Sequence, residues 1–131
     1  MKIDKRILSL LIRGMLEFME EKGFYVPALQ AAFIDDCTIA RLNETFMNCP
    51  GPTNVLSFPD CEGGEGELFI SMDTLAREAL MYGQKACVYL TRLLAHGLCH
   101  LAGMDHGDEM EHFQQLLEKN ALDEKFPEFL K

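Results

Sequence analysis

Three of the four histidines in the sequence fall within a stretch of eleven residues, at positions 96, 100 and 106. His96 and His100 are four residues apart in a segment that is predicted to be helical, so their imidazoles lie on one face, one turn apart. Gly103 lets the chain leave the helix and double back, which brings His106 to the same point. Three neutral imidazoles are a known zinc shell, with the fourth tetrahedral position left to water. The spacing therefore predicts one Zn²⁺ ion held by His96, His100 and His106.

The residue after the first histidine separates two classes of zinc enzyme. The spacing H-x-x-x-H-x-x-G-x-x-H is that of the metzincin proteases, which carry a glutamate directly after the first histidine as general base. This sequence has Gly97 there, which neither accepts a proton nor orients water, so a zinc protease is only a minor alternative. Asp105 is the candidate for orienting an imidazole or serving as the general base, and the alternative is that it only caps a helix end. Cys99 lies around the helix from His100 and is expected in the core.

The hydrophobic pattern predicts the elements that must hold this site. Apolar residues at helical spacing, with glycines as stops, predict five helices at about 4–22, 38–47, 73–82, 85–102 and 108–122. Asp36 is the expected N-cap of the second of these helices. Short apolar runs predict strands at 29–34, 55–58 and 68–70. The sequence thus predicts a single α/β (α+β) domain over residues 1–131, with helices in the majority.

Charge, hydropathy and cysteine content limit the classes of protein further. Twelve basic and 21 acidic residues give a net charge of −9, which disfavours long-range attraction to nucleic acid. The longest uncharged apolar run near the start, residues 7–12, is far shorter than the ~20 residues of a membrane span, and no cleavage signal follows it. Five cysteines without a C-x-x-C pair fit reduced thiols. We therefore expect a cytoplasmic protein with no membrane partner and no nucleotide cofactor.

Two segments resemble the signature segments of the YbeY family of endoribonucleases. One reads His96-Gly97-x-x-His100-Leu101-x-Gly103-x-Asp105-His106, and the other reads Pro52-Thr53-Asn54-Val55-Leu56-Ser57-Phe58-Pro59. A weaker third block is Gly66-Glu67-Leu68-Phe69-Ile70-Ser71, where the family usually has aspartate at the position of Glu67. The order and spacing of the blocks agree with the family, and the resemblance covers roughly residues 30 to 115.

The resemblance implies a mixed four-stranded sheet with helices around it and a zinc ion held by His96, His100 and His106. It also implies a zinc-dependent endoribonuclease that acts in rRNA processing, at the 3′ end of the small-subunit (16S) RNA, and in ribosome quality control. The implied partners are ribosomal RNA, the small ribosomal subunit and its assembly factors.

One departure from the family pattern bears on RNA cleavage. Family members usually carry an arginine a few residues before the proline-threonine-asparagine segment, and Met47 stands there in this sequence. The change removes a fork of donors suited to phosphate. Arg77, Lys85 and Arg92 precede the histidine motif, and each is expected to be the partner of an exposed salt bridge. With the acidic charge, the departure leaves a second hypothesis open, a metal-stabilised ribosome-assembly factor that binds RNA without cutting it.

Overall fold

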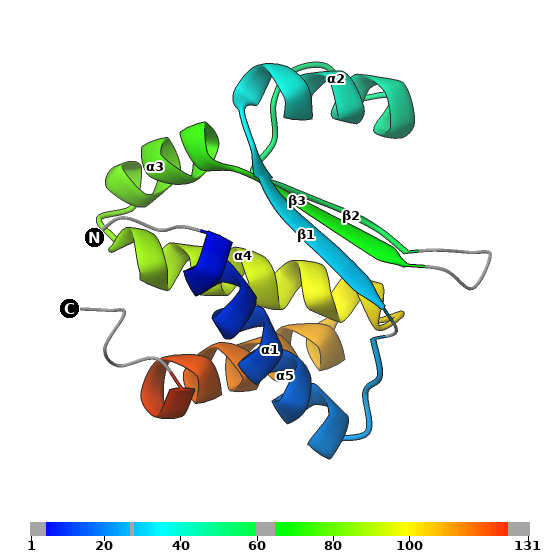
Figure 1. Cartoon of the computed structure of the whole chain (residues 1–131), viewed down its shortest axis with the longest axis vertical. Coiled ribbons are helices and arrows are strands. Elements are labelled where there is room, and N and C mark those ends of the chain that lie inside the picture. The colour runs from blue at the N-terminus through cyan, green and yellow to red at the C-terminus, as the bar shows by residue number, and fades with distance from the viewer. Residues whose placement is uncertain (1–4, 27, 60–64, 126–131) are drawn as a thin grey trace.

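The computed structural model describes residues 5–26, 28–59 and 65–125, and these residues form five α-helices, three strands and a terminal π-helical turn (Figure 1). The elements follow in the order α1 (Lys5–Glu21), β1 (Leu29–Ile34), α2 (Asp36–Met47), β2 (Val55–Phe58), β3 (Gly66–Ser71), α3 (Met72–Met81), α4 (Ala86–Leu101), α5 (Asp108–Asn120) and η1 (Ala121–Lys125). Every helix and strand predicted from the sequence is present, with ends displaced by one or two residues. Residue 4, the predicted start of the first helix, lies outside the described part of the chain.

The sheet is mixed, as expected, and has the strand order β1-β3-β2. Strand β3 pairs parallel with β1 and antiparallel with β2, so β3 is central and both neighbours are edge strands. Four strands were expected from the family resemblance, whereas the described residues contain three. The α+β class is confirmed, and the prediction of one domain over residues 1–131 stays a prediction.

Helix α4 forms the centre of the hydrophobic core. Eleven of its sixteen residues are buried, because it packs against β2 and β3 on one side and against α1, α3 and α5 on others. Figure 1 shows α2 on the opposite side of the sheet from α4, α1 and α5. A helix that is enclosed in this way holds its side chains in fixed directions, so α4 is a rigid support for the histidines that it carries.

The start of α2 corrects one prediction. Asp35, and not Asp36, is the N-cap residue, because its side chain accepts a hydrogen bond from the backbone N–H of Thr38. The carboxylate of Asp36 instead accepts from the hydroxyls of Ser71 and Thr74, which lie at the start of α3. Two adjacent aspartates look equivalent as caps in a sequence, and the position of α3 decides between them.

The end of α4 is as predicted. Gly103 has a φ of 87°, a left-handed conformation that costs glycine little, and the chain turns back there. No helix in the described residues has the length and apolar content that a membrane span requires.

Candidate metal centre

The three predicted histidines converge on one point. His96 and His100 come from consecutive turns of α4, and His106 follows the turn made at Gly103. One ring nitrogen from each histidine lies within 4.8 Å of the others. The ring centroids of His100 lie 4.6 Å from those of both His96 and His106.

The spacing of the nitrogens fits a shared metal ion. The Nε2 atoms of His96 and His100 are 3.2 Å apart. Two nitrogens bound to one tetrahedral zinc ion at ~2.0–2.1 Å would be about 3.4 Å apart, which agrees closely. When neither of these nitrogens carries a proton, their lone pairs repel, and a cation between them removes the repulsion. The donor set of three imidazoles in a half-buried pocket therefore suits a borderline divalent metal with an open coordination position.

Gln114 on α5 fixes the orientation of His96. Its Oε1 lies 3.1 Å from Nδ1 of His96, and its Nε2 donates to Glu118 at 3.3 Å. The second contact fixes which end of the amide faces the ring, so the Nδ1–H of His96 must be the donor to Oε1. The lone pair of Nε2 is then left for a metal. Sequence analysis missed Gln114, because nothing in the local sequence shows that α5 lies against α4.

The surroundings of His100 keep its ring neutral. Burial, followed by the neighbouring rings of His96 and His106, lowers the pKa of His100 below its usual value of 6.5. A neutral imidazole at pH 7 is the form that binds metals. A hydrogen bond from the ring to the backbone of Met104 and the charge of Asp105 act in the opposite direction. Asp105 itself is exposed on the turn that carries His106.

Gly97 is required by packing. A Cβ atom built on this residue would lie 2.4 Å from Cδ1 of Leu68 and 3.5 Å from Cγ2 of Val55. The position after the first histidine therefore faces the sheet and not the site. This gives a physical reason why the glutamate of a metzincin is missing, since a carboxylate there would be driven into the core. Cys99 is also fully buried in this core, as expected.

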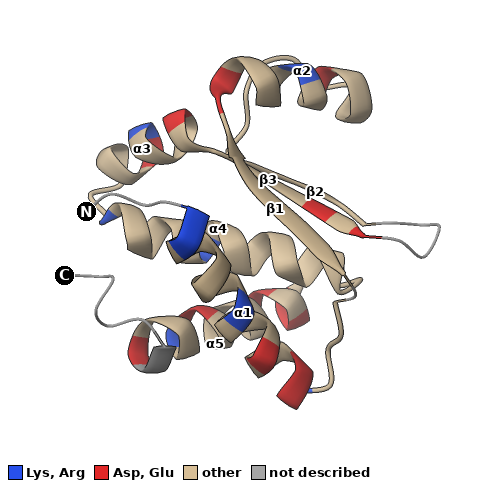
Figure 2. Ribbon diagram, viewed as in Figure 1, with Lys and Arg blue, Asp and Glu red and all other residues tan. Residues whose placement is uncertain are grey.

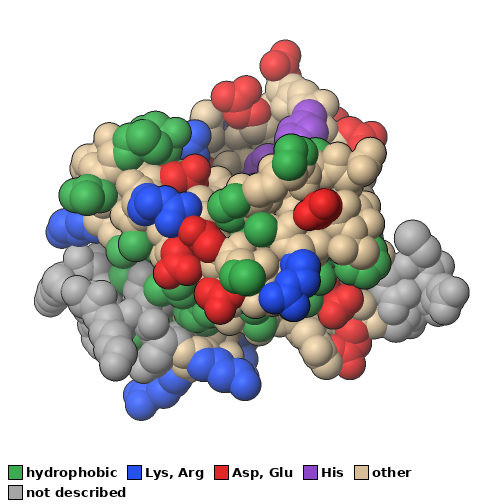
Figure 3. Space-filling view, turned by 90° about the horizontal axis from the view of Figure 1, so that it is seen from above, with side chains coloured by type: hydrophobic (Ala, Val, Ile, Leu, Met, Phe, Trp, Pro, Cys, Tyr) green, Lys and Arg blue, Asp and Glu red, His purple; other side chains and the backbone are tan. Residues whose placement is uncertain are grey.

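A cavity of about 420 Å³ opens beside His96. Its lining comes from β2, α3, α4, α5 and the segment before β2, and includes Asn54, Tyr82, Tyr89, Arg92, His96 and Gln114. Figure 3 shows histidine side chains beside a hollow in the surface. A separate hollow is lined by Asp105, His106 and the start of α5. Figure 2 shows that acidic residues gather on α5 and at the end of α1, where they would repel an RNA strand.

Comparison with known proteins decides the family. The sequence pattern of the family described as Endoribonuclease YbeY matches residues 1–124. The chain belongs to the YbeY family. A YbeY protein named Endoribonuclease YbeY from Nitratidesulfovibrio vulgaris is 42% identical over 123 residues, covering 77% of this chain and 74% of that protein. Another protein of that name, from Lawsonia intracellularis, is 40% identical over 104 residues, covering 79% of this chain and 74% of that protein.

The fold is shared with a solved structure as well. The solution structure of a Thermotoga maritima protein superposes with a TM-score of 0.69 and covers 94% of this chain and 87% of its own. At 24% identity, this similarity concerns the fold alone.

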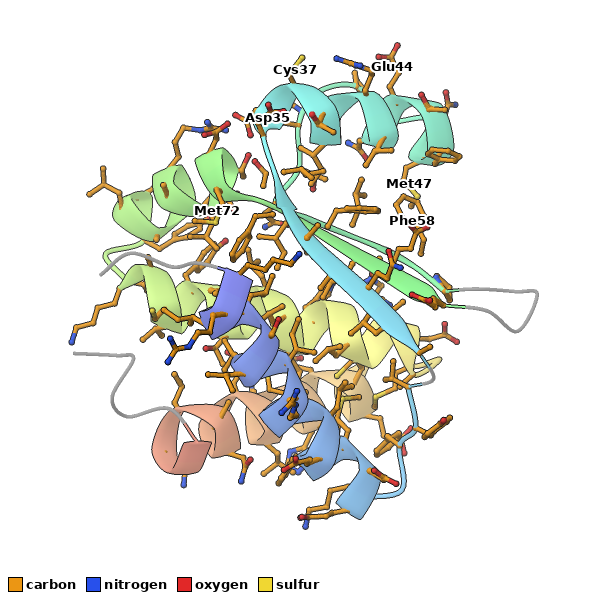
Figure 4. All side chains as sticks on the ribbon, in the orientation of Figure 1. Asp35, Cys37, Glu44, Met47, Phe58 and Met72 are labelled. Atoms are coloured by element: carbon orange, nitrogen blue, oxygen red, sulfur yellow. The ribbon has the colours of Figure 1, made fainter. Side chains whose placement is uncertain are left out.

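Met47, which departs from the YbeY pattern, and the arginines that precede the histidine motif lie in different parts of the structure. Met47 is exposed at the end of α2, where the neighbouring Phe46 contacts Phe58 of β2 (Figure 4). Arg77 is paired with Asp36 at 2.7 Å, which confirms the salt bridge expected for it. Among the described residues Arg92 makes no salt bridge, so the one expected for it is not seen there. Arg92 lines the cavity beside His96 instead.

Proposed function

We propose that the protein is a zinc-dependent endoribonuclease that acts in ribosomal RNA processing in the cytoplasm, at the 3′ end of the small-subunit RNA, and in ribosome quality control. Its partners are then ribosomal RNA, the small subunit and its assembly factors. The observation that carries the proposal is the convergence of three ring nitrogens within 4.8 Å beside an open cavity, in a chain of the YbeY family.

His96, His100 and His106 would hold the zinc ion. When bound, zinc supplies a positive charge that polarises a phosphoryl oxygen. Gln114 keeps Nε2 of His96 directed at the centre through the hydrogen bond to Nδ1. The open cavity beside His96 gives an RNA strand access to this ring.

Proton removal from the attacking group is assigned to Asp105. This residue is exposed and directly precedes His106 on the turn after α4, so its carboxylate is accessible to substrate. The attacking oxygen is either that of water or the 2′-hydroxyl of the RNA itself. The two routes leave different ends, because only attack by the 2′-hydroxyl produces a 2′,3′-cyclic phosphate. Identification of the product ends by mass spectrometry decides between them.

The experiment that tests the activity is cleavage of a small-subunit rRNA fragment with a 3′ extension. The wild type is compared with His100→Ala and with His112→Ala, prepared identically. His112 is exposed on α5 and lies outside the histidine cluster, so it controls for the loss of an imidazole. Cleavage by the wild type and His112→Ala, but not by His100→Ala, supports the proposal. Equal cleavage by all three indicates a contaminating nuclease, and no cleavage by any contradicts the proposal for this substrate.

A second candidate function is a metal-stabilised assembly factor that binds the ribosome without cutting RNA. The net charge of −9 and the exposed Phe46 and Met47 at the end of α2 favour it, because they suit a basic protein better than RNA. A cell that depends on this protein distinguishes the two functions. Growth restored by a folded His100→Ala protein would favour the binding role, and failure to restore growth would favour cleavage.

A further inference from the structure

The cavity beside His96 contains a single arginine, on the same face of α4 as the metal site. Arg92, His96 and His100 follow one another at intervals of four residues along α4. Residues four apart on a helix lie on one face and are separated by a rise of about 6 Å. Arg92 therefore lies one helical turn before His96, and its side chain lines the same cavity.

The described residues leave the side chain of Arg92 without a hydrogen bond or a salt bridge, whereas Arg77 is held at 2.7 Å by Asp36. Helix α4 contains no acidic residue to neutralise it. The charge of Arg92 lowers the pKa of Glu118, but desolvation dominates there, and the net effect raises the pKa of that carboxyl group. The donors of Arg92 are thus free to bind an anion.

Two residues of the cavity lining, Asn54 and Tyr89, bind the carboxylate of Glu78. Oε1 of Glu78 accepts hydrogen bonds from the side-chain amide of Asn54 at 2.9 Å and from the hydroxyl of Tyr89 at 2.7 Å. Burial and this hydrogen bond to Glu78 raise the pKa of Tyr89 to about 12, so the hydroxyl stays protonated and continues to donate. Among the described residues, Glu78 makes no salt bridge with Arg92.

An aromatic ring lies exposed at the edge of the same cavity. Tyr82 is 58% exposed, and its ring lies 5.9 Å from that of Tyr89, which is buried and anchored to Glu78. An exposed aromatic ring that contacts a buried, hydrogen-bonded ring is a suitable surface for a nucleobase. The cavity therefore offers a cationic fork and an aromatic surface next to each other, which is the combination that single-stranded nucleic acids require.

We propose that this cavity binds one nucleotide of single-stranded RNA next to the bond that is cut, with Arg92 holding its phosphate through paired hydrogen bonds and Tyr82 stacking on its base. The inference rests on the proposed ribonuclease function, since it names the substrate contacts of that site. It assigns the phosphate contact to a residue of α4, beside the metal ligands, and leaves Met47 outside the cavity lining.

Binding of a fluorescein-labelled single-stranded RNA oligonucleotide tests the proposal, with fluorescence anisotropy measured at low salt and with chelator present so that no cleavage accompanies binding. Arg92→Ala is compared with the wild type, with Arg92→Lys and with Arg13→Ala. Arg13 is exposed on α1 outside this cavity, so its removal changes the net charge equally. We expect Arg92→Ala to weaken binding about tenfold, and to reduce the slope of log K against log salt by about 0.7, the value for one lost phosphate contact with a single strand. Arg92→Lys should lie between, and Tyr82→Leu should weaken binding several-fold.

Three results would overturn the proposal: equal binding by Arg92→Ala and Arg13→Ala, an unchanged salt slope in Arg92→Ala, or no measurable binding by the wild type. Circular dichroism and the melting temperature confirm that each variant is folded. The same proteins, loaded with zinc, are then tested for cleavage. A wild type that binds RNA through Arg92 but does not cut it contradicts the ribonuclease function and leaves the nucleotide site standing. If Arg92→Ala cuts RNA at the same rate as the wild type, the result contradicts the nucleotide site and leaves the ribonuclease function standing.

Discussion

Replacement of Gly97 by alanine has two opposite effects on stability: it raises the helix propensity of α4, and it crowds the side chain of Leu68. Gly97 lies in the interior of α4, where alanine is favoured over glycine by about 1 kcal/mol because it restricts the unfolded chain. The added methyl group, however, would lie 2.4 Å from Cδ1 of Leu68, a side chain that is 0% exposed. A carbon contact needs about 3.5–4.0 Å, so Leu68 or the helix must move by more than 1 Å.

Overpacking of this kind costs roughly 1–3 kcal/mol. After subtraction of the gain in helix propensity, we expect Gly97→Ala to lower the free energy of unfolding by about 1 kcal/mol. For a chain of 131 residues this corresponds to a fall of about 4 °C in the melting temperature. Urea unfolding followed by circular dichroism measures the change.

A double-mutant cycle with Leu68→Ala assigns the cost to the contact. Leu68→Ala alone should cost about 2–5 kcal/mol, because it leaves a cavity in a fully buried position. In the double variant the methyl group of residue 97 enters that space, so the combined loss should be smaller than the sum by at least 0.5 kcal/mol, on the order of other contacting pairs. Additive effects, or an increase in stability of about 1 kcal/mol in Gly97→Ala, would refute the packing argument.

Three further predictions concern the metal, the pH and the orientation of a ligand. Free zinc at ~100 times its dissociation constant should stabilise the wild type by about 2.7 kcal/mol, or about 10 °C by differential scanning fluorimetry. His112→Ala should keep this shift and His100→Ala should lose it, and an equal shift in both would exclude the histidine cluster as the site. Hydrogen bonds from Ser71, Thr74 and Arg77 lower the pKa of Asp36 from 3.8 to about 2, so the stability that they contribute is complete above about pH 4 and is lost as the pH falls towards 2. In urea titrations at pH 5 and pH 2.5, Asp36→Asn should reduce the difference in the free energy of unfolding between the two pH values. The same difference in variant and wild type would argue against these hydrogen bonds as its source. Gln114→Leu should weaken zinc binding about tenfold in a competition titration with a chelating dye, because His96 loses its acceptor, whereas Gln115→Leu should have no effect.

The histidine site shows how far local sequence can predict a functional centre. The four-residue interval between His96 and His100 fixes their common face, because helix geometry is set by neighbours along the chain. Gly103 adopts the left-handed conformation that its position suggested. Convergence of the three rings was therefore predictable from one short segment, and the structure confirms it. The helices and strands were predictable for the same reason, since they depend on short-range periodicity.

The number of strands and the N-cap of α2 depend on contacts between residues that are far apart in the sequence. Asp35 and Asp36 are both suitable caps, and only the approach of Ser71, Thr74 and Arg77 assigns Asp36 to a different network. The described residues form three strands, whereas four were inferred from the resemblance to the family.

What the sequence by itself determined is the set of histidines that could hold a metal ion together, because all three lie on one helix and the turn after it. Tertiary structure decided what surrounds them. Gln114 reaches His96 across 18 residues of sequence, and Asn54 reaches Glu78 across 24, through the packing of α5 on α4 and of the β2 segment on α3. Gly97 is needed because Leu68 of β3 passes directly above it. Contacts of this range depend on which faces the helices bury, and that choice minimises the exposed apolar surface of the whole chain.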